Sequence, residues 1–355
     1  MHKAIRYIGS KQKVLPFLED NLFINLKEGD SFFDGFVGSG IVSQYVSEKH
    51  KNIKLSGGDL SLYSQILFDI LNIGREFINF EEILNIIKEF EAEDLVGGDI
   101  FNEFSQYGVP TSYIESRNFF HEKSGKTIDS YKKFIAKKLA DKKITKSQEK
   151  ILLYFILSYA CKVANTTSVF GAFLKSEAKH KPFNSVFVEK ILNDLKEIKE
   201  LKNSADFYLG DIVENLKVIP KQAVIYLDPP YSTRRYESNY HILSYIVDMG
   251  FSSEELKNGS KTGQPKTMGE NPFGKKKGTE VVFAEMIKEG VNKSDLLGIS
   301  YNTDGIIKQV WMEDFCKKNG YVLDTRKLEY KRFKSKNEVK NITELEEILW
   351  LIKKQ

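Results

Sequence analysis

The chain has few cysteines and no long apolar run. Only two of its 355 residues are cysteine, and these two, Cys161 and Cys316, lie far apart and form no CxxC pair. Isolated cysteines of this kind predict reduced core residues, so we expect neither a disulfide framework nor a metal site. No apolar stretch approaches the twenty residues that cross a bilayer, and Met1–Gln12 has no charged-then-apolar leader. We therefore expect no membrane association and a cytoplasmic location.

Hydrophobic residues make up 41% of the chain, which is enough to fill the core of one large domain or two. The net charge of +4 is distributed unevenly. Residues 111–200 contain 18 Lys and Arg against 10 Asp and Glu, a net charge of +8, so the rest of the chain carries −4. A basic middle segment is typical of a lobe that binds phosphates, although lysine-rich helix faces in contact with solvent would give the same pattern.

The central motif is Ala223–Tyr231, AVIYLDPPY. An apolar run that leads into two prolines predicts a buried strand that stops there, because proline cannot donate to a sheet. Asp228 should then lie at the carboxyl end of a central strand, where open α/β sheets bind their ligands. The alternative is a rigid turn that carries an acidic surface residue.

Three other segments read as strands that end in a turn. Residues 31–40, SFFDGFVGSG, predict a strand and a glycine turn before a helix at 41–48, although the dinucleotide GxGxxG is absent. Residues 53–60 predict a second strand with Asp59 at its end, which is placed to bind ribose hydroxyls, to cap a helix at 60–71, or to do both. Residues 206–211 predict a third strand, after which Asp211 could cap a turn.

Between residues 72 and 203 the pattern becomes helical. We expect helices at 81–90, 129–140, 147–164 and 185–201, with loops at 97–126 and 165–182. Within these loops, residues 118–121 and 165–173 mix amides, hydroxyls and aromatics that could either reach bases or pack the loops. Residues 259–278 predict a mobile basic loop, and helices at 279–290 and 303–318 then alternate with strands at 295–301, 320–324 and 344–354.

The ordered motifs resemble those of the D12 class (Dam-like) N6-adenine DNA methyltransferases. The resemblance rests on DPPY at 228–231, DxFxGSG at 34–40, an aromatic residue four positions before a lysine near the start, and an RxYxxNYH run after DPPY. It implies an α/β class I S-adenosylmethionine-dependent methyltransferase fold, with a seven-stranded, mainly parallel sheet and helices on both faces. It also implies a catalytic domain formed by residues 1–71 and 204–355, and an inserted helical target-recognition domain at 72–203.

The resemblance also implies roles for individual residues, with S-adenosyl-L-methionine as the cofactor and no metal. Asp228 and the Pro229 carbonyl would accept the two hydrogens of the adenine amine, Pro230 would stiffen the loop, and Tyr231 would stack on an extruded base. The cofactor-binding residues would be Tyr7, Lys11, Asp34, Phe36, Gly38, Gly40, Asp59, Asp211 and Asp228. The DNA-binding residues would be Arg234, Arg235, Asn239 and Tyr240.

The partner implied is double-stranded DNA, with a cognate restriction endonuclease as a possible companion. The sequence leaves open an RNA adenine methyltransferase, a protein-glutamine methyltransferase, and a non-catalytic DNA-binding protein that keeps the fold. Asp rather than Asn at position 228 argues against glutamine as the substrate, and intact motifs argue against a non-catalytic protein. No cysteine lies near DPPY, so the nucleophile that cytosine carbon-5 methylation needs is missing.

Overall fold

The computed structural model describes residues 10–330 and 345–355, except for residues 75, 77, 200–203, 232, 234–236, 267–270 and 276. Seven strands form one sheet in the order β3-β2-β1-β4-β5-β7-β6. Their bounds are β1 Ser31–Asp34, β2 Lys54–Asp59, β3 Ser204–Leu209, β4 Gln222–Leu227, β5 Ser294–Asn302, β6 Tyr321–Tyr330 and β7 Leu345–Lys354. The first five strands pair in parallel, and β7 runs antiparallel to both β5 and β6. This confirms the seven-stranded, mainly parallel sheet.

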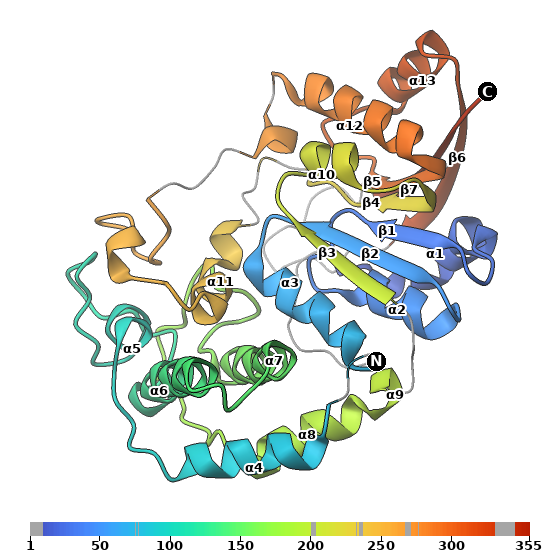
Figure 1. Ribbon diagram of the computed structural model, residues 1–355. Helices are drawn as coiled ribbons and strands as arrows, with labels where there is room; N and C mark the ends of the chain where they lie inside the picture. Colours follow the sequence, from blue (N-terminus) through green and yellow to red (C-terminus); the bar gives the residue numbers. More distant parts are fainter. Residues whose placement is uncertain are drawn as a thin grey trace.

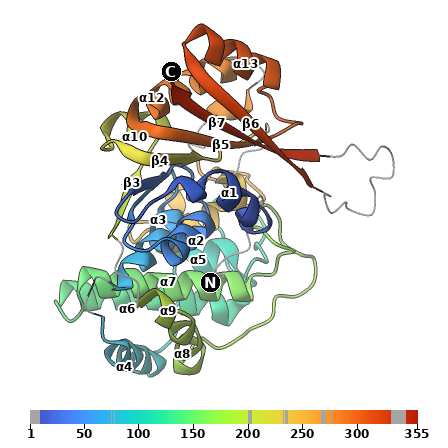
Figure 2. The ribbon, with the colours of Figure 1, turned by 90° about the vertical axis from the view of Figure 1, so that its right-hand side faces the viewer.

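Helices cover both faces of the sheet (Figures 1 and 2). One face carries α1 (Leu15–Asn21), α2 (Ile41–Lys49) and α3 (Leu62–Asp69), and the other carries α10 (Ile212–Val218), α12 (Thr279–Lys293) and α13 (Gln309–Lys318). Successive strand residues enter opposite cores: Phe32 and Leu349 join one apolar cluster, whereas Phe33 and Trp350 join the other. Both faces are therefore buried, which explains the near-continuous apolar runs of the central strands.

A helical lobe lies beyond α3 (Figure 1), and we use that name for residues 80–199 together with residues 237–266. Its helices are α4 Phe80–Glu91, α5 Asp99–Phe104, α6 Glu122–Ala140, α7 Lys146–Val163, α8 Ser185–Asp194, α9 Lys196–Lys199 and α11 His241–Val247. Every residue from 151 to 160 of α7 is buried, so this helix forms the centre of the lobe. Short 3₁₀ helices complete the described chain: η1 Lys11–Lys13, η2 Phe23–Asn25, η3 Ile70–Gly74, η4 Glu237–Asn239, η5 Ser253–Glu255 and η6 Pro272–Gly274.

The sequence-based prediction of a loop at 97–126 was wrong, because this interval contains α5 and the start of α6. The amino end of α5 is capped from a distance: the carboxylate of Asp129, on α6, accepts the backbone N–H groups of Gly98, Ile100 and Phe101. Gly125 of α6 permits close packing against the end of α5, since a Cβ would lie 2.0 Å from Ser105 Oγ. Local sequence shows neither effect.

Other boundaries differ by less. The helix expected at 303–318 begins only at Gln309, after a turn in which Ile307 N donates to the hydroxyl of Tyr301 at 3.3 Å. The segment expected as one helix at 185–201 is divided into α8 and α9. Within the described residues, no helix has both the length and the apolar character that a membrane span requires.

Candidate active site

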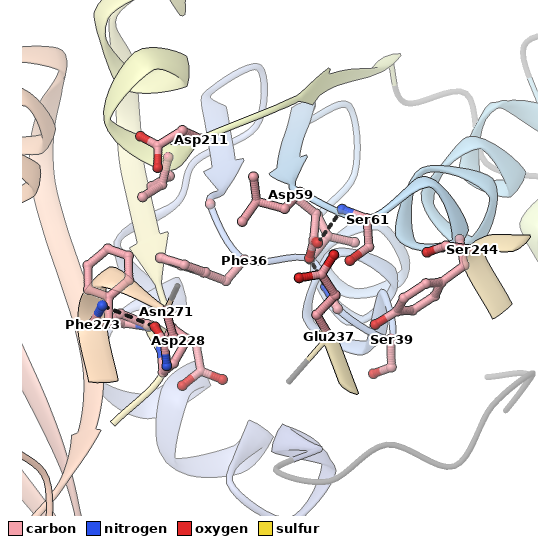
Figure 3. Close-up of a pocket in the computed structure, with 18 of the residues that line it drawn as sticks. Phe36, Ser39, Asp59, Ser61, Asp211, Asp228, Glu237, Ser244, Asn271 and Phe273 are labelled. Carbon is pink, nitrogen blue, oxygen red and sulfur yellow. Dashed lines mark hydrogen bonds between the residues drawn. The ribbon is translucent and has the colours of Figure 1, made fainter. Parts of the chain in front are cut away.

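The site lies where the strand order reverses. From β1 the chain proceeds through β2 to β3 on one side, whereas β4 lies on the other side of β1 and leads to β5. The loops that leave β1 and β4 diverge at this point, which is where open α/β sheets form a crevice. A cavity of about 510 Å³ opens here, and it is lined by residues from both loops. Figure 3 shows Asp228 and Asp59 at two sides of this cavity, with Phe36 between them.

The glycine turn after β1 brings main-chain groups to the cavity. Gly38 and Gly40 have φ angles of +51° and +74°, which favour glycine, and Gly40 is the N-cap residue of α2. Gly35 N donates to the Tyr226 carbonyl at 2.8 Å, and a Cβ at Gly35 would lie 2.3 Å from Leu227 Cδ2. The turn therefore packs directly against the end of β4, where the catalytic motif begins.

Asp59 fixes this turn to the next strand. Its Oδ2 accepts Gly38 N at 2.8 Å and its Oδ1 accepts Ser61 N at 2.9 Å. The N-cap residue of α3 is Ser61, so the alternative of Asp59 as the helix cap is not what the structure shows. Burial raises the pKa of Asp59. Asp59 also lines the cavity.

Two residues expected to bind the cofactor, Asp34 and Gly40, do not line the cavity. Asp34 is 1% exposed, its Oδ2 accepts Ser43 Oγ at 2.6 Å, and its Oδ1 has no hydrogen-bond partner among the described residues. Burial raises the pKa of Asp34 to about 7. Both residues support the glycine turn from behind.

An aromatic pair and an acidic cap form another wall. Phe36 meets Phe273 edge to face, with ring centroids 5.7 Å apart. Phe273 lies in η6, where its N–H donates to Asn271 Oδ1 at 3.0 Å (Figure 3). Asp211 caps α10 by accepting Val213 N at 2.8 Å, which confirms the capping alternative, and it also lines the cavity. The sequence analysis missed Phe273 because its surroundings are rich in glycine and lysine.

Asp228 follows β4 directly, and its charge is balanced by a lysine that the sequence assigned to the cofactor. Lys11 Nζ lies 3.0 Å from Asp228 Oδ1 and 2.6 Å from Glu347 Oε1. Burial raises the pKa of Asp228 to about 6, against the opposing charge of Lys11. Burial alone would lower the pKa of Lys11, but the carboxylates of Asp228 and Glu347 outweigh it and hold that pKa well above its usual value. Glu347 was not found from the sequence.

The rest of the DPPY motif also faces the cavity. Pro229, Pro230 and Tyr231 line it, and the Tyr231 ring meets Tyr301 edge to face at 6.3 Å. An aromatic ring so held offers a fixed flat surface beside Asp228. The arrangement places a carboxylate acceptor, a rigid main chain and an aromatic face around one point.

The expected DNA contacts are placed differently. Arg234 and Arg235 lie outside the described residues, as does Tyr7, which was expected to bind the cofactor. Asn239 is half-buried in η4, and its carbonyl accepts Phe170 N at 2.9 Å. Tyr240 is 1% exposed, and its ring centroid lies 5.7 Å from that of Tyr63 on α3. In this structure Tyr240 packs against α3, and its contact with DNA stays a prediction.

The loops that could either read bases or pack are mostly packed. Phe119 and Phe120 are fully buried. The Asn165 amide donates to the carbonyls of Asn118 at 3.1 Å and Ser176 at 2.8 Å, and the Asn118 amide also donates to Ser176 O at 2.7 Å. These amides are engaged in shaping the loop, whereas Ser168 is exposed at its tip.

The sheet and this site define a class of protein. A seven-stranded sheet with an antiparallel β7, a glycine turn after β1, an acidic residue at the end of β2 and DPPY after β4 is the class I methyltransferase fold. The parallel strands put these three features at the same edge of the sheet, so motifs far apart in sequence share one cavity.

Comparison with known proteins gives the family. The sequence profile of the D12 class N6 adenine-specific DNA methyltransferases matches residues 7–313, and the chain belongs to this family. The type II methyltransferase M.NlaIII of Neisseria lactamica is 27% identical over 338 residues, which cover 93% of each chain. The type II methyltransferase M.CviAII of Paramecium bursaria Chlorella virus 1 is 26% identical, over 86% of this chain and 85% of that one.

A third relative is longer than this chain. The modification methylase StsI of Streptococcus sanguinis is 23% identical over 99% of this chain, which spans only 52% of StsI. The family match confirms the resemblance found in the sequence, and the chain is an adenine-specific DNA methyltransferase. It also favours the DNA enzyme over the RNA-methylating and non-catalytic alternatives.

Proposed function

We propose that this chain transfers a methyl group from S-adenosyl-L-methionine to the N6 amine of an adenine that has left the stack of duplex DNA. The observation that carries the proposal is the position of Asp228. Its carboxylate lies at the wall of a cavity that extends without interruption to the glycine turn and Asp59. One cavity can therefore hold both a methyl donor and a base.

The residues of the cavity fit S-adenosyl-L-methionine. Asp59 lines the cavity at the end of β2, and its carboxylate is suited to accept hydrogen bonds from a pair of ribose hydroxyls. Phe36 and Phe273 offer an apolar surface for a purine, and Asp211 lines the same cavity. Bound there, the cofactor supplies an electrophilic methyl group.

The DPPY motif is suited to preparing the amine. The lone pair of an adenine amine is delocalised into the ring, and acceptors for both amine hydrogens would localise it. The Asp228 carboxylate and the Pro229 carbonyl would be these acceptors, and Tyr231 would hold the base by stacking. Because the pKa of Asp228 is about 6, the group is mostly ionised at neutral pH and can take the proton that the methylated amine must lose. Positioning in a dry pocket would supply much of the rate.

We assign DNA recognition to the insertion, residues 72–203, and the catalytic domain to residues 1–71 and 204–355. The basic character of residues 111–200 supports a phosphate-binding role for this part of the lobe. The loop around Ser168 contacts the segment that follows DPPY, because Phe170 N donates to Asn239 O. A loop in this place is suited to reading bases beside the extruded adenine.

The names of the relatives motivate a biological setting. StsI is a modification methylase, and M.NlaIII is a type II methyltransferase. We propose that this chain protects DNA in the cytoplasm against a cognate restriction endonuclease.

The test is methylation of unmodified genomic DNA by the purified protein, followed by single-molecule sequencing to map N6-methyladenine. We expect methyladenine at one sequence context with the wild type and none with Asp228→Ala. Parallel reactions on RNA should show no methylation. Methylated RNA with unmodified DNA would overturn the proposal, and so would a fully active Asp228→Ala protein.

A further inference from the structure

The catalytic carboxylate shares its lysine with a residue from the far end of the chain. Lys11 and Glu347 are 336 positions apart, yet their charged groups meet at 2.6 Å. Lys11 belongs to η1, Asp228 follows β4, and Glu347 lies at the start of β7. The three side chains are largely enclosed, with exposed fractions of 9% for Lys11, 21% for Asp228 and 15% for Glu347.

Sharing the ammonium has a chemical consequence. An ammonium paired with Asp228 alone would keep that carboxylate ionised, but without a second partner it could also turn to contact both carboxylate oxygens and leave less acceptor capacity for an amine hydrogen. Lys11 lies closer to Glu347, at 2.6 Å, than to Asp228, at 3.0 Å. A second carboxylate thus draws the ammonium away from Asp228 while leaving its positive charge nearby.

We propose that Glu347 is a positioning residue of the methyl-transfer site, which holds the Lys11 ammonium beside Asp228 so that Asp228 keeps an oxygen available to accept an amine hydrogen. This inference rests on the proposed role of Asp228. It assigns Lys11 to the catalytic carboxylate rather than to the cofactor.

Within the part of the chain that the structure describes, four groups influence the charge of Asp228. Lys11 from η1 stabilises the carboxylate, Glu347 from β7 opposes it, and Tyr226 of β4 and Asp34 of β1 also interact with it electrostatically. Removing the charge of Glu347 should lower the pKa of Asp228, and removing that of Lys11 should raise it. Because methyl transfer needs the ionised carboxylate, its rate falls as pH drops through this pKa. The fall of the rate at low pH forms the acidic limb of the pH–rate profile. The two substitutions should therefore shift this limb in opposite directions.

The experiment compares single-turnover methylation of unmodified genomic DNA across pH, with radiolabelled S-adenosyl-L-methionine, for wild type, Glu347→Gln and Lys11→Met. We expect Glu347→Gln to lose about tenfold or more in rate at neutral pH, as for loss of a hydrogen bond to a charged group, and to shift the limb to lower pH. Lys11→Met should shift the limb to higher pH. Calorimetric affinity of Glu347→Gln for S-adenosylhomocysteine should remain that of the wild type.

The neighbouring residue provides a matched control. Glu346 on the same strand pairs with Lys327 at 2.9 Å, so Glu346→Gln also removes one carboxylate from one lysine. It should leave both the rate and the limb unchanged. Glu347→Asp, which keeps the charge, should retain the wild-type limb and recover part of the rate, and it carries the test if Glu347→Gln does not fold.

The outcomes separate the two proposals. If Glu347→Gln matches Glu346→Gln in rate and pH profile, or if Glu347→Asp shifts the limb as the Gln variant should, the role of Glu347 is refuted and that of Asp228 stands. If Asp228→Ala keeps full activity, the proposed function itself fails.

Discussion

We call the site at the carboxyl ends of β1, β2 and β4 the sheet edge. The sheet edge and the helical lobe are held together by different means. At the sheet edge, short motifs place main-chain groups directly: Gly38 N and Ser61 N meet Asp59, and Gly35 N meets the Tyr226 carbonyl. In the lobe, buried charges join segments far apart in sequence. Chemistry at strand ends can therefore be inferred from short sequence motifs. The architecture that surrounds it depends on contacts between residues that are far apart in sequence and meet only in the fold.

Arg117 illustrates the second kind of construction. It is fully buried and pairs with Glu103 at 2.6 Å, and it also donates to Ser112 Oγ at 2.8 Å and to the Ser260 carbonyl at 2.7 Å. The last contact binds the segment after α11 to the insertion. Lys132 makes a similar connection by donating to the carbonyls of Tyr245 and Asp248 at the end of α11. The lobe is thus built from two parts of the chain.

The largest expected effect lies at the sheet edge. Asp228→Ala should reduce methyl transfer by about 10²–10⁴-fold, because no other group in the motif replaces the carboxylate acceptor. The fold should persist, since the substitution removes a partly exposed charge that burial destabilises. Asp228→Asn should be milder, because its amide oxygen still accepts one hydrogen. Single-turnover rates and circular dichroism would check both points, and a folded Asp228→Ala within about tenfold of wild type would contradict the prediction.

The next effect tests the lobe. Glu103→Ala leaves the Arg117 guanidinium buried without its carboxylate, which should cost about 3–5 kcal/mol of unfolding free energy. Denaturant unfolding would measure the loss. Lys217→Ala, which removes an exposed lysine paired with Glu214, is the control and should show no measurable change. A Glu103→Ala protein as stable as this control would mean that the lobe does not depend on its buried charges.

The same contrast explains what the sequence could predict. The sequence could predict that DPPY, the glycine turn and Asp59 lie together, because each follows a parallel strand and the ends of these strands meet at one cavity. Glu347 was not found, since nothing near it marks its contact with Lys11. The packing of Tyr240 was not predicted, because its partner, Tyr63, belongs to a helix far earlier in the chain. The helix α5 was missed because its cap, Asp129, comes from α6.

A smaller effect separates cofactor binding from catalysis. Asp59→Ala should weaken the binding of S-adenosylhomocysteine by about ten- to a hundredfold, as expected for lost hydrogen bonds to a charged group. Lys11→Ala should leave this affinity nearly unchanged and reduce the rate, because Lys11 contacts Asp228 and Glu347. Titration calorimetry combined with single-turnover rates distinguishes the two. Equal losses of affinity in both variants would return Lys11 to the cofactor pocket.

The smallest effect concerns the division of DNA contacts between the lobe and the segment after DPPY. Ser168 is exposed at the tip of a loop that the Asn118 and Asn165 amides hold in shape. If this loop reads bases, Ser168→Ala should relax preference at one position by about 1–3 kcal/mol and leave other positions unchanged.

Arg234, which lies outside the described residues, should instead hold the DNA backbone. Arg234→Ala should then weaken binding to all duplexes alike. It should also reduce the slope of log affinity against log salt concentration by about one unit, because one phosphate contact fewer releases one counterion fewer. Fluorescence-anisotropy titrations across salt, with cognate and altered duplexes, would measure both variants. A changed recognition sequence in Arg234→Ala, together with a uniform loss in Ser168→Ala, would reverse the assignment. The segment after DPPY would then read the bases, and the lobe would mainly bind phosphates.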